Sequence, residues 1–231
     1  MPSAARFAFS SPVGGQTPVP DATFFVSQGY QYVRKIEPAA WVNRSSTLSW
    51  RGTANGEGRL TFDAADSADP TVIPRLRLIM KLREQPDCDA RLVRIEYKGA
   101  DWTGVPLAGN FVGPPIPTEH WSSCKYAIDI DGETNAWSNL FVRLLMGCCV
   151  IKVESQHGYR QWYYDRLKPF ENYVPVKPDM SDLLEKIDWA RSHEAEARTI
   201  AAAGRELALS LDFKSVRQDA IDIIAANWKR G

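Results

Sequence analysis

Short apolar runs alternate with amphipathic segments along most of this chain, and this alternation constrains the fold more than any other feature. The runs expected to form strands are Thr47–Arg51, Arg91–Tyr97, Tyr126–Ile130, Cys149–Val153 and Tyr173–Val176. The segments between them that are expected to form helices are Pro74–Arg83, Trp137–Met146 and Tyr159–Arg166. Strands that alternate with helices are typical of a parallel sheet. The sequence therefore predicts an α/β fold.

The chain after Asp179 has helical periodicity throughout. Its three amphipathic segments are Asp182–Arg191, Glu194–Leu211 and Phe213–Trp228. Ser181 is placed to cap the first helix, and Ser192 or His193 to begin the second, because short polar side chains satisfy free backbone N–H groups there. Helices are therefore expected to close the fold at this end.

Two stretches lack sustained periodicity. Residues 1–45 are rich in proline, glycine and serine and carry aromatic clusters, and they resemble the end of a larger unit. The segment Gly104–Trp121 is rich in proline and glycine and is interpreted as a long surface loop beside the site.

Composition excludes some classes of function. The 28 Lys and Arg residues balance the 28 Asp and Glu residues, so no net charge recruits nucleic acid or an anionic membrane. The apolar runs are shorter than the roughly 20 residues that a membrane-spanning helix needs. The four cysteines form no CxxC pair, and we interpret them as reduced core residues of a cytoplasmic protein.

The stretch KYAIDIDGETNAW carries the clearest chemical signal. Asp129 and Asp131 lie two residues apart at the end of a predicted strand, so their side chains share one face. Open α/β sheets bind ligands at this edge. Gly132 permits a tight turn, and Asn135 stands just before a predicted helix whose free N–H groups favour anions. The pattern predicts a phosphate-binding loop.

Three interpretations of the two aspartates stay open on the residues alone. They could coordinate Mg²⁺ or Mn²⁺ on a diphosphate, since hard cations prefer carboxylate oxygens. They could be the nucleophile and acid of a haloacid-dehalogenase-type phosphatase, whose signature resembles DIDG-x-T. That motif should open the fold, whereas here two strands precede it. The third interpretation is that Asp129 and Asp131 only shape the turn.

Five ordered segments resemble glycosyltransferase family 90. They are WRGTANG (Trp50–Gly56), KYAIDIDGETNAWSNLFVRLLMG (Lys125–Gly147), VIKVES (Val150–Ser155), QWYYDRLKPFENYVPVKPDMSDL (Gln161–Leu183) and EARTIAAAGRE (Glu196–Glu206). This family contains capsule-associated and lipopolysaccharide-modifying sugar transferases, and protein O-glucosyltransferases and O-xylosyltransferases. The form with Thr-Asn-x-Trp is most similar to the short bacterial lipopolysaccharide members.

The resemblance implies a GT-B architecture with two Rossmann-like lobes, a UDP-sugar held mainly by the C-terminal lobe, an inverting reaction and no required metal or other cofactor. In this chain it implies a remnant of the N-terminal acceptor lobe at residues 1–45 and a near-complete Rossmann-like donor lobe at 46–211. A C-terminal helix follows at 212–231.

The resemblance also assigns roles around the donor diphosphate. Arg51, with Gly52 and Thr53 beside it, is expected to neutralise the leaving UDP, because a fixed guanidinium can do what a metal does elsewhere. Trp137 and Ser138 are expected to face the phosphates or the sugar together with Asn135.

Other positions are assigned more weakly by the resemblance. Many members carry a second arginine where this chain has Leu140, and Arg143 one turn later is a weaker substitute. Asp131 and Gly132 are expected to shape the donor loop. Glu154, at a strand end, is expected to accept hydrogen bonds from ribose hydroxyls. Tyr163 and Tyr164 are interpreted as core residues, and the alternative is that they stack on the uracil ring.

The general base of the family is expected to precede Met1, so no catalytic residue is assigned. The predicted function is transfer of a hexose or pentose from a UDP-sugar to a lipopolysaccharide or capsule glycan, in the cytoplasm or at the inner membrane surface. The alternatives are a UDP-sugar-binding remnant without efficient transfer, and the phosphatase that uses Asp129 and Asp131.

Overall fold

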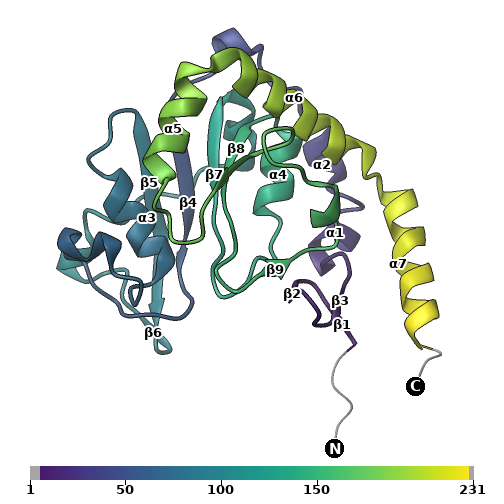
Figure 1. Cartoon of the computed structure of the whole chain (residues 1–231), viewed down its shortest axis with the longest axis horizontal. Coiled ribbons are helices and arrows are strands. Elements are labelled where there is room, and N and C mark those ends of the chain that lie inside the picture. The colour runs from purple at the N-terminus through teal and green to yellow at the C-terminus, as the bar shows by residue number, and fades with distance from the viewer. Residues whose placement is uncertain (1–5, 229–231) are drawn as a thin grey trace, which may run out of the picture.

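Six strands form one central sheet in the computed structural model, which describes residues 6–228 (Figure 1). Their order across the sheet is β10-β8-β7-β4-β5-β6. Their bounds are β4 (Leu48–Ala54), β5 (Cys88–Tyr97), β6 (Ala100–Asp101), β7 (Tyr126–Asp129), β8 (Cys149–Val153) and β10 (Val174–Val176). Of these six strands, β6 alone runs antiparallel to its neighbour, so five strands share one direction.

The order of the parallel strands reverses between β4 and β7. Numbered along the chain, the five strands stand in the order 2-1-3-4-5. Helix α3 (Pro74–Leu82) follows β4 and packs on one face, whereas α4 (Asn139–Leu145) follows β7 and packs on the other. Ligands of such sheets bind where the order reverses, outside the carboxyl ends of the strands. The crevice between the ends of β4 and β7 is therefore the expected site.

The central strands are buried on both faces, which explains their nearly continuous apolar sequences. Tyr126 and Ile128 of β7 pack into a core with α3, whereas Ala127 packs into a second core with α4. Alternate residues of a strand point to opposite faces, so Asp129 lies on the α4 face. Asp131 lies beyond the end of β7, so the expectation that it shares a face with Asp129 stays a prediction.

The N-terminal segment packs against the α4 face. It contains the short strands β1 (Phe7–Ala8), β2 (Ser11–Pro12) and β3 (Thr17–Pro18), and the helices α1 (Ala22–Val26) and α2 (Gln31–Arg34). Phe24, Tyr30 and Val33 are buried in the same core as Phe141 of α4. The segment thus shares its hydrophobic core with the sheet.

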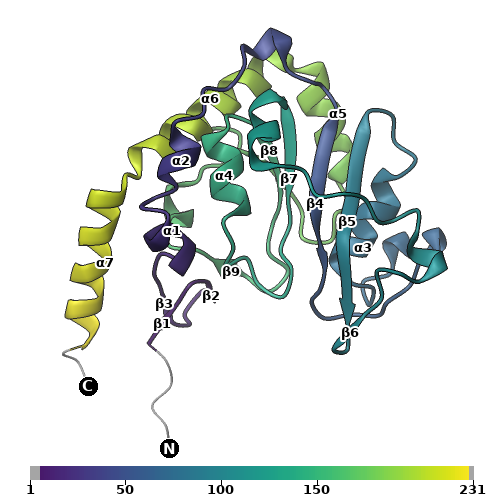
Figure 2. The same cartoon turned by 180° about the vertical axis from the view of Figure 1, so that it is seen from behind.

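Three helices follow the last strand (Figures 1 and 2). They are α5 (Leu183–Ser192), α6 (Glu194–Ser210) and α7 (Phe213–Trp228). Ile200 of α6 packs in the core on the α3 face, whereas Ala208 packs in the core on the α4 face. Helix α6 therefore passes from one face of the sheet to the other, and α7 begins beside α1, where Phe213 packs against Phe24 and Phe25. Within residues 6–228, no helix is both long and apolar enough to span a membrane.

The five predicted strands are confirmed, with bounds that move by a few residues. The predicted helix at Tyr159–Arg166 is wrong. Tyr159–Arg160 forms β9, which pairs antiparallel with β2, and Tyr164–Arg166 forms a single 3₁₀ turn. The side chain of Gln161 donates to the carbonyl of Trp137, so long-range contacts fix this segment where local periodicity suggested a helix.

Smaller expectations also change. Helix α4 begins at Asn139 and not near Trp137, and Asp182 occupies the position before α5 that was assigned to Ser181. The remaining 3₁₀ turns are Trp41–Asn43, Ala64–Ala68, Pro106–Ala108 and Thr118–Ser123. Two of them lie in the predicted surface loop, where Phe111 and Trp121 are buried, so that loop contributes to the core. All four cysteines are free, and three of them are buried.

Candidate functional site

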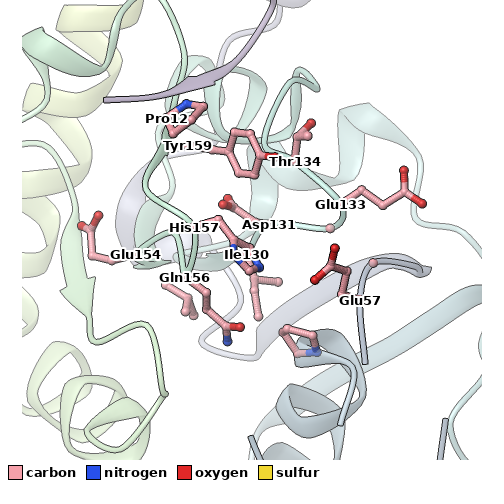
Figure 3. A pocket seen from close by; sticks show the side chains of 14 residues that line it. Pro12, Glu57, Ile130, Asp131, Glu133, Thr134, Glu154, Gln156, His157 and Tyr159 are labelled. Atoms are coloured by element: carbon pink, nitrogen blue, oxygen red, sulfur yellow. The ribbon is translucent and has the colours of Figure 1, made fainter. Parts of the chain in front are cut away.

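Two cavities flank the point where the strand order reverses. The strand-end cavity, about 580 Å³, lies outside the ends of β7 and β8 and is lined by Glu57, Asp131, Gly132, Glu133, Thr134, Glu154, His157 and Tyr159, among others (Figure 3). The arginine cavity, about 500 Å³, lies between β4 and α4 and is lined by Arg51, Gly52, Thr53, Arg75, Trp121, Trp137, Ser138 and Arg143, among others. Acidic side chains predominate in the first cavity and arginines in the second.

Arg75 fixes the backbone between the two cavities. Its guanidinium donates to the carbonyls of Thr53 at 2.9 Å, Ile130 at 3.1 Å and Asp131 at 3.0 Å. It also donates to Oδ1 of Asn55 at 2.9 Å. Burial lowers the pKa of Arg75, and the nearby aspartates oppose that shift. One side chain of α3 thus ties the end of β4 to the end of β7.

Position 132 requires glycine because the side chains of Asn55 and Arg75 lie too close to its backbone for a Cβ atom. A Cβ atom at this position would lie 2.5 Å from Oδ1 of Asn55 and 3.0 Å from the guanidinium carbon of Arg75. Its φ is not in the left-handed region, so the restriction is steric. The glycine lets the loop after β7 press against the Arg75 side chain.

Arg51 lines the arginine cavity, but its N–H donors already form hydrogen bonds within the protein. Its guanidinium forms a 2.7 Å ion pair with Asp89 and donates to the carbonyls of Trp50, Asp89 and Pro114. The side chain is 10% exposed. These contacts join β4 to β5 and to the long loop, so binding of a phosphate by Arg51 would require exchange of partners.

Arg143 differs from the other arginines of this cavity. Its guanidinium carbon lies 3.5 Å from the centre of the Trp121 ring. It forms neither a hydrogen bond nor an ion pair with any residue between positions 6 and 228. Burial lowers the pKa of Arg143 to about 10, so it stays charged at neutral pH. An unpaired guanidinium thus faces the cavity.

Buried charges lie under the loop after β7. Asp129 stands opposite Lys152 in the register of β7 and β8, and both are buried. Burial raises the pKa of Asp129 to about 6, although Lys152 opposes the shift. Burial also raises the pKa of Asp131. The protein therefore favours the protonated form of both carboxyl groups more than water does.

Several buried polar atoms near these charges have no hydrogen-bond partner in the part of the chain that the structure describes. They are both carboxylate oxygens of Asp131, Oδ1 of Asn135 and the hydroxyls of Tyr163 and Tyr164. Buried polar groups are almost always paired, with water or ligand if not with protein. This cluster therefore marks a wet or ligand-contacting region beside the strand-end cavity.

The glutamate side chains that line the strand-end cavity point in different directions. In Figure 3 the carboxylate of Glu57 extends toward the region of Asp131, whereas that of Glu133 extends away from it. Glu154 accepts a 2.9 Å hydrogen bond from the hydroxyl of Tyr173, which holds its side chain at the rim. Across residues 6–228, no group of three or more His, Cys, Asp and Glu side chains is arranged to hold a metal ion.

Comparison with known proteins decides the family. Residues 31–225 match the family described as glycosyl transferase family 90. The chain belongs to this family. The family 90 chain is 37% identical over 176 residues to protein O-glucosyltransferase 3 of Homo sapiens, covering 74% of this chain and 29% of that protein. It is 41% identical over 105 residues to uncharacterized protein 035R of Invertebrate iridescent virus 3, covering 45% of this chain and 10% of that protein.

The family 90 chain therefore spans less than a third of each of these two relatives. Among solved structures, it resembles sucrose-phosphate synthase from Thermosynechococcus elongatus, with a TM-score of 0.53 and 14% identity. The match covers 94% of this chain and 54% of that one. The likeness concerns the fold, and it confirms the expected α/β, GT-B-like architecture with a Rossmann-like lobe. The division at residues 45 and 211 stays a prediction.

The residues predicted from the sequence of this family 90 chain separate into two groups. Arg51, Gly52, Thr53, Trp137 and Ser138 line the arginine cavity, and Asp131, Gly132 and Glu154 line the strand-end cavity. Asn135 lines neither, and its Nδ2 donates to the carbonyl of Tyr159. Leu140 is buried in the core, whereas Arg143 reaches the cavity. The roles given to these residues stay predictions.

Sequence reasoning missed several residues of the site, among them Glu57, Arg75, Glu133, His157 and Tyr159. Arg75 lay in a predicted helix that also contains Arg77 and Lys81, so its charge did not distinguish it, and His157 and Tyr159 lay in or next to a segment predicted to be helical. A usable signal for Arg75 was its place directly after Pro74, because a helix that starts at the carboxyl edge of a sheet directs its first side chains toward the site.

Proposed function

We propose that this family 90 chain acts in a glycosyltransferase that transfers a hexose or pentose from a UDP-sugar to a glycan acceptor. Family membership and the arginine cavity at the reversal of strand order support this proposal. The observation that carries it is the presence of three arginines at the place where open α/β sheets bind phosphorylated ligands.

The diphosphate of the donor is proposed to lie in the arginine cavity. Guanidinium groups recognise phosphate oxygens through paired N–H donors, and Arg51, Arg75 and Arg143 supply a positive potential there. Glu96 also lines this cavity, but its carboxylate pairs with Arg94 at 2.9 Å. Arginines in this number can stabilise the charge that develops on departing UDP, so we propose that no metal is required.

The sugar and the ribose are proposed to face the strand-end cavity. Carboxylates accept hydrogen bonds from hydroxyl groups, and Glu57, Asp131 and Glu154 offer them at its wall. The acceptor hydroxyl attacks the anomeric carbon, the bond from that carbon to the UDP oxygen breaks, and the hydroxyl proton passes to a base that we do not assign. Attack opposite the leaving group inverts the configuration.

The acceptor is proposed to be a lipopolysaccharide or capsule glycan, and the compartment the cytoplasm or the inner membrane surface. The likeness of DIDGETNAW to the short bacterial members supports the acceptor class. Buried free thiols at Cys124, Cys148 and Cys149 suit a reducing compartment. Relatives with animal O-glucosyltransferase names make a protein hydroxyl the acceptor to test alongside the glycan.

Calorimetry with UDP and a transfer assay with radiolabelled UDP-hexose test the proposal. We expect UDP to bind in millimolar EDTA, and label to pass to a lipopolysaccharide or capsule fraction under the same conditions. Absence of UDP binding contradicts the donor site, and loss of binding in EDTA contradicts metal independence. Binding without transfer favours a UDP-sugar-binding chain without turnover. Release of phosphate that requires Mg²⁺ and disappears in Asp129→Asn would favour the phosphatase alternative.

A further inference from the structure

A third cavity lies between the loop after β4 and the hairpin of β5 and β6, at the same edge of the sheet as the strand-end cavity (Figure 1). This hairpin cavity, about 550 Å³, is lined by Asn55, Glu57, Tyr97, Lys98 and Glu133, among others. Glu57 and Glu133 also line the strand-end cavity, and Asn55 also lines the arginine cavity. The hairpin cavity therefore adjoins both cavities in which the donor is proposed to lie.

Two glycines bring the hairpin cavity and the strand-end cavity close together. A Cβ atom at Gly56, where φ is +106°, would lie 3.2 Å from the carbonyl oxygen of Gly132, so the loops after β4 and β7 are in close contact. The residues next to these glycines, Glu57 and Glu133, line both cavities. In Figure 3 the carboxylate of Glu133 extends away from Asp131. A ligand of the hairpin cavity would thus lie next to the place proposed for the sugar.

Some charged groups of the hairpin cavity are neutralised within the protein. Arg94 pairs with Glu96 at 2.9 Å and with Asp101 at 3.4 Å, and these ion pairs hold the two strands of the hairpin together. The carboxylates of Glu57 and Glu133 line the cavity and form neither a hydrogen bond nor an ion pair within the part of the chain that the structure describes. Two carboxylates therefore remain available to a ligand.

Asn55 adds hydrogen-bond donors to these acceptors. Its Oδ1 accepts from the guanidinium of Arg75 at 2.9 Å. Because a guanidinium can only donate, the amide oxygen must face Arg75, and this contact fixes the orientation of the amide group. The two N–H donors of Nδ2 have no acceptor among the described residues. The cavity thus offers both donors and acceptors.

Tyr97 gives the hairpin cavity an aromatic wall. The ring is partly buried, Nζ of Lys98 lies 5.2 Å from its centre, and the ring of Trp102 meets it at an interplanar angle of 77°. These contacts come from the same hairpin and hold the Tyr97 ring in place. An aromatic ring of fixed orientation therefore stands beside the polar groups.

We propose that the hairpin cavity binds uncharged sugar residues of the acceptor glycan. A sugar hydroxyl both donates and accepts hydrogen bonds, so it can pair with the carboxylates of Glu57 and Glu133 and with Nδ2 of Asn55. The C–H groups of a sugar ring carry a slight positive charge and pack on the negative face of an aromatic ring such as that of Tyr97.

The charges of the cavity disfavour other ligands. The two open carboxylates outweigh the single ammonium group of Lys98, so an anion such as phosphate is repelled. A metal ion would find no group of three His, Cys, Asp or Glu side chains arranged to hold it among residues 6–228. The proposal rests on the proposed function only where it calls the glycan the acceptor, because binding can be measured without a donor.

Nuclear magnetic resonance of the isotope-labelled chain tests the proposal without UDP. The probes are oligosaccharides released from lipopolysaccharide and from capsule. We expect at least one preparation to bind and to shift the side-chain amide signals of Asn55 and the ring signals of Tyr97. Binding of neither preparation overturns the proposal, and so does binding that leaves both sets of signals unchanged.

Variants of two lining residues measure the contacts. Glu133→Ala should weaken glycan binding roughly tenfold, as for one hydrogen bond to a charged group, and it should fold because Glu133 is exposed. Glu196→Ala is the matched control, since Glu196 is also exposed and lines none of the three cavities. Tyr97→Leu should weaken binding about 2- to 10-fold, whereas Tyr97→Phe, which keeps the ring, should bind like the wild type. Wild-type affinity in both Glu133→Ala and Tyr97→Leu overturns the proposal.

Calorimetry with UDP separates this proposal from the proposed function. Tyr97 lines the hairpin cavity but neither donor cavity, so Tyr97→Leu should lower glycan affinity and keep UDP affinity. An equal fall in both affinities indicates a loss of structure and overturns the role of Tyr97. If the wild type binds UDP but no glycan, the proposed function stands and the hairpin cavity is not a glycan site. If it binds the glycan but not UDP, the glycan site stands and the proposed function fails.

Discussion

Nε of Arg75 lies 3.0 Å from the carbonyl oxygen of Asp131, and this hydrogen bond joins the first turn of α3 to the loop after β7. The same guanidinium reaches the carbonyl of Thr53 in β4. The two strands between which the sheet order reverses are thus connected at their carboxyl ends by one buried side chain. The shape of both cavities depends on this connection.

Replacing Arg75 should destabilise the fold strongly. Arg75→Met leaves three carbonyls and Oδ1 of Asn55 without their donor, and each unsatisfied buried acceptor costs about 1–3 kcal/mol. We expect a loss of about 3 kcal/mol or more in the free energy of unfolding, measured with urea. Arg77→Met on the same helix is the control, because Arg77 makes a single bond, to the carbonyl of Asp179. Equal losses in the two variants would contradict the role given to Arg75.

A methyl group at position 132 should disturb the same contact from the other side. Gly132→Ala places a Cβ at 2.5 Å from Asn55 Oδ1, so the loop or the Arg75 side chain must move. Overpacking of this kind costs about 1–3 kcal/mol. The control is Gly104→Ala, because a Cβ there meets nothing within 4 Å. Thermal unfolding should show a lower Tm for Gly132→Ala and little change for Gly104→Ala, and a similar Tm in both would refute the steric argument.

The fold could be predicted from the sequence where one local pattern determined one element. Cys149–Val153 and Phe213–Trp228 were expected with the bounds that the structure shows, because an apolar run and a helical stripe are local signals. These features need no knowledge of distant contacts. The shared face of Asp129 and Asp131 stays a prediction, because β7 ends at Asp129 and Asp131 lies beyond it.

The remaining features depend on contacts that no local pattern contains. Tyr159–Arg160 pairs with Ser11–Pro12, residues far away in the sequence, so its strand could not be recognised from its neighbours. The guanidinium of Arg51 is paired because Asp89 lies in the adjacent strand. That of Arg143 stacks on Trp121, and it forms no hydrogen bond with any of the described residues. Sequence identifies an arginine, but only the packed structure shows whether its donors are free.

The carboxyl group of Asp129 should make stability depend on pH. Its folded-state pKa is about 6, above the ordinary value of 3.8, so the folded state binds the proton more tightly than the unfolded chain does. This contribution to stability is complete below the unfolded-state pKa and is lost as the pH rises through about 6. At about 1.36 kcal/mol per pKa unit, the loss is at most about 3 kcal/mol.

Comparison of Asp129→Asn with the wild type isolates that contribution, because the amide does not titrate. The charged groups that face Asp129 are Lys152, Asp131, Arg75 and Arg143, and they are present in both proteins. From about pH 4 to about pH 6 the wild type should lose stability relative to the variant in urea unfolding, and above that range the difference should stay constant. Asp69→Asn is the control, since Arg59 lowers the pKa of Asp69 to about 2, outside this window. Parallel pH profiles for wild type and Asp129→Asn would show that Asp129 is not perturbed.

Glu154 should determine whether the chain distinguishes ribose from deoxyribose. Its carboxylate lines the strand-end cavity and is held by the hydroxyl of Tyr173, so it is oriented before a ligand arrives. If it accepts from the ribose 2′-hydroxyl, the wild type should bind UDP roughly tenfold more tightly than 2′-deoxy-UDP, as for one hydrogen bond to a charged group. Glu154→Ala should bind the two nucleotides equally, whereas Tyr173→Phe, which keeps the carboxylate, should retain most of the preference. Calorimetry with both nucleotides decides the matter, and an unchanged preference in Glu154→Ala would remove Glu154 from the donor site.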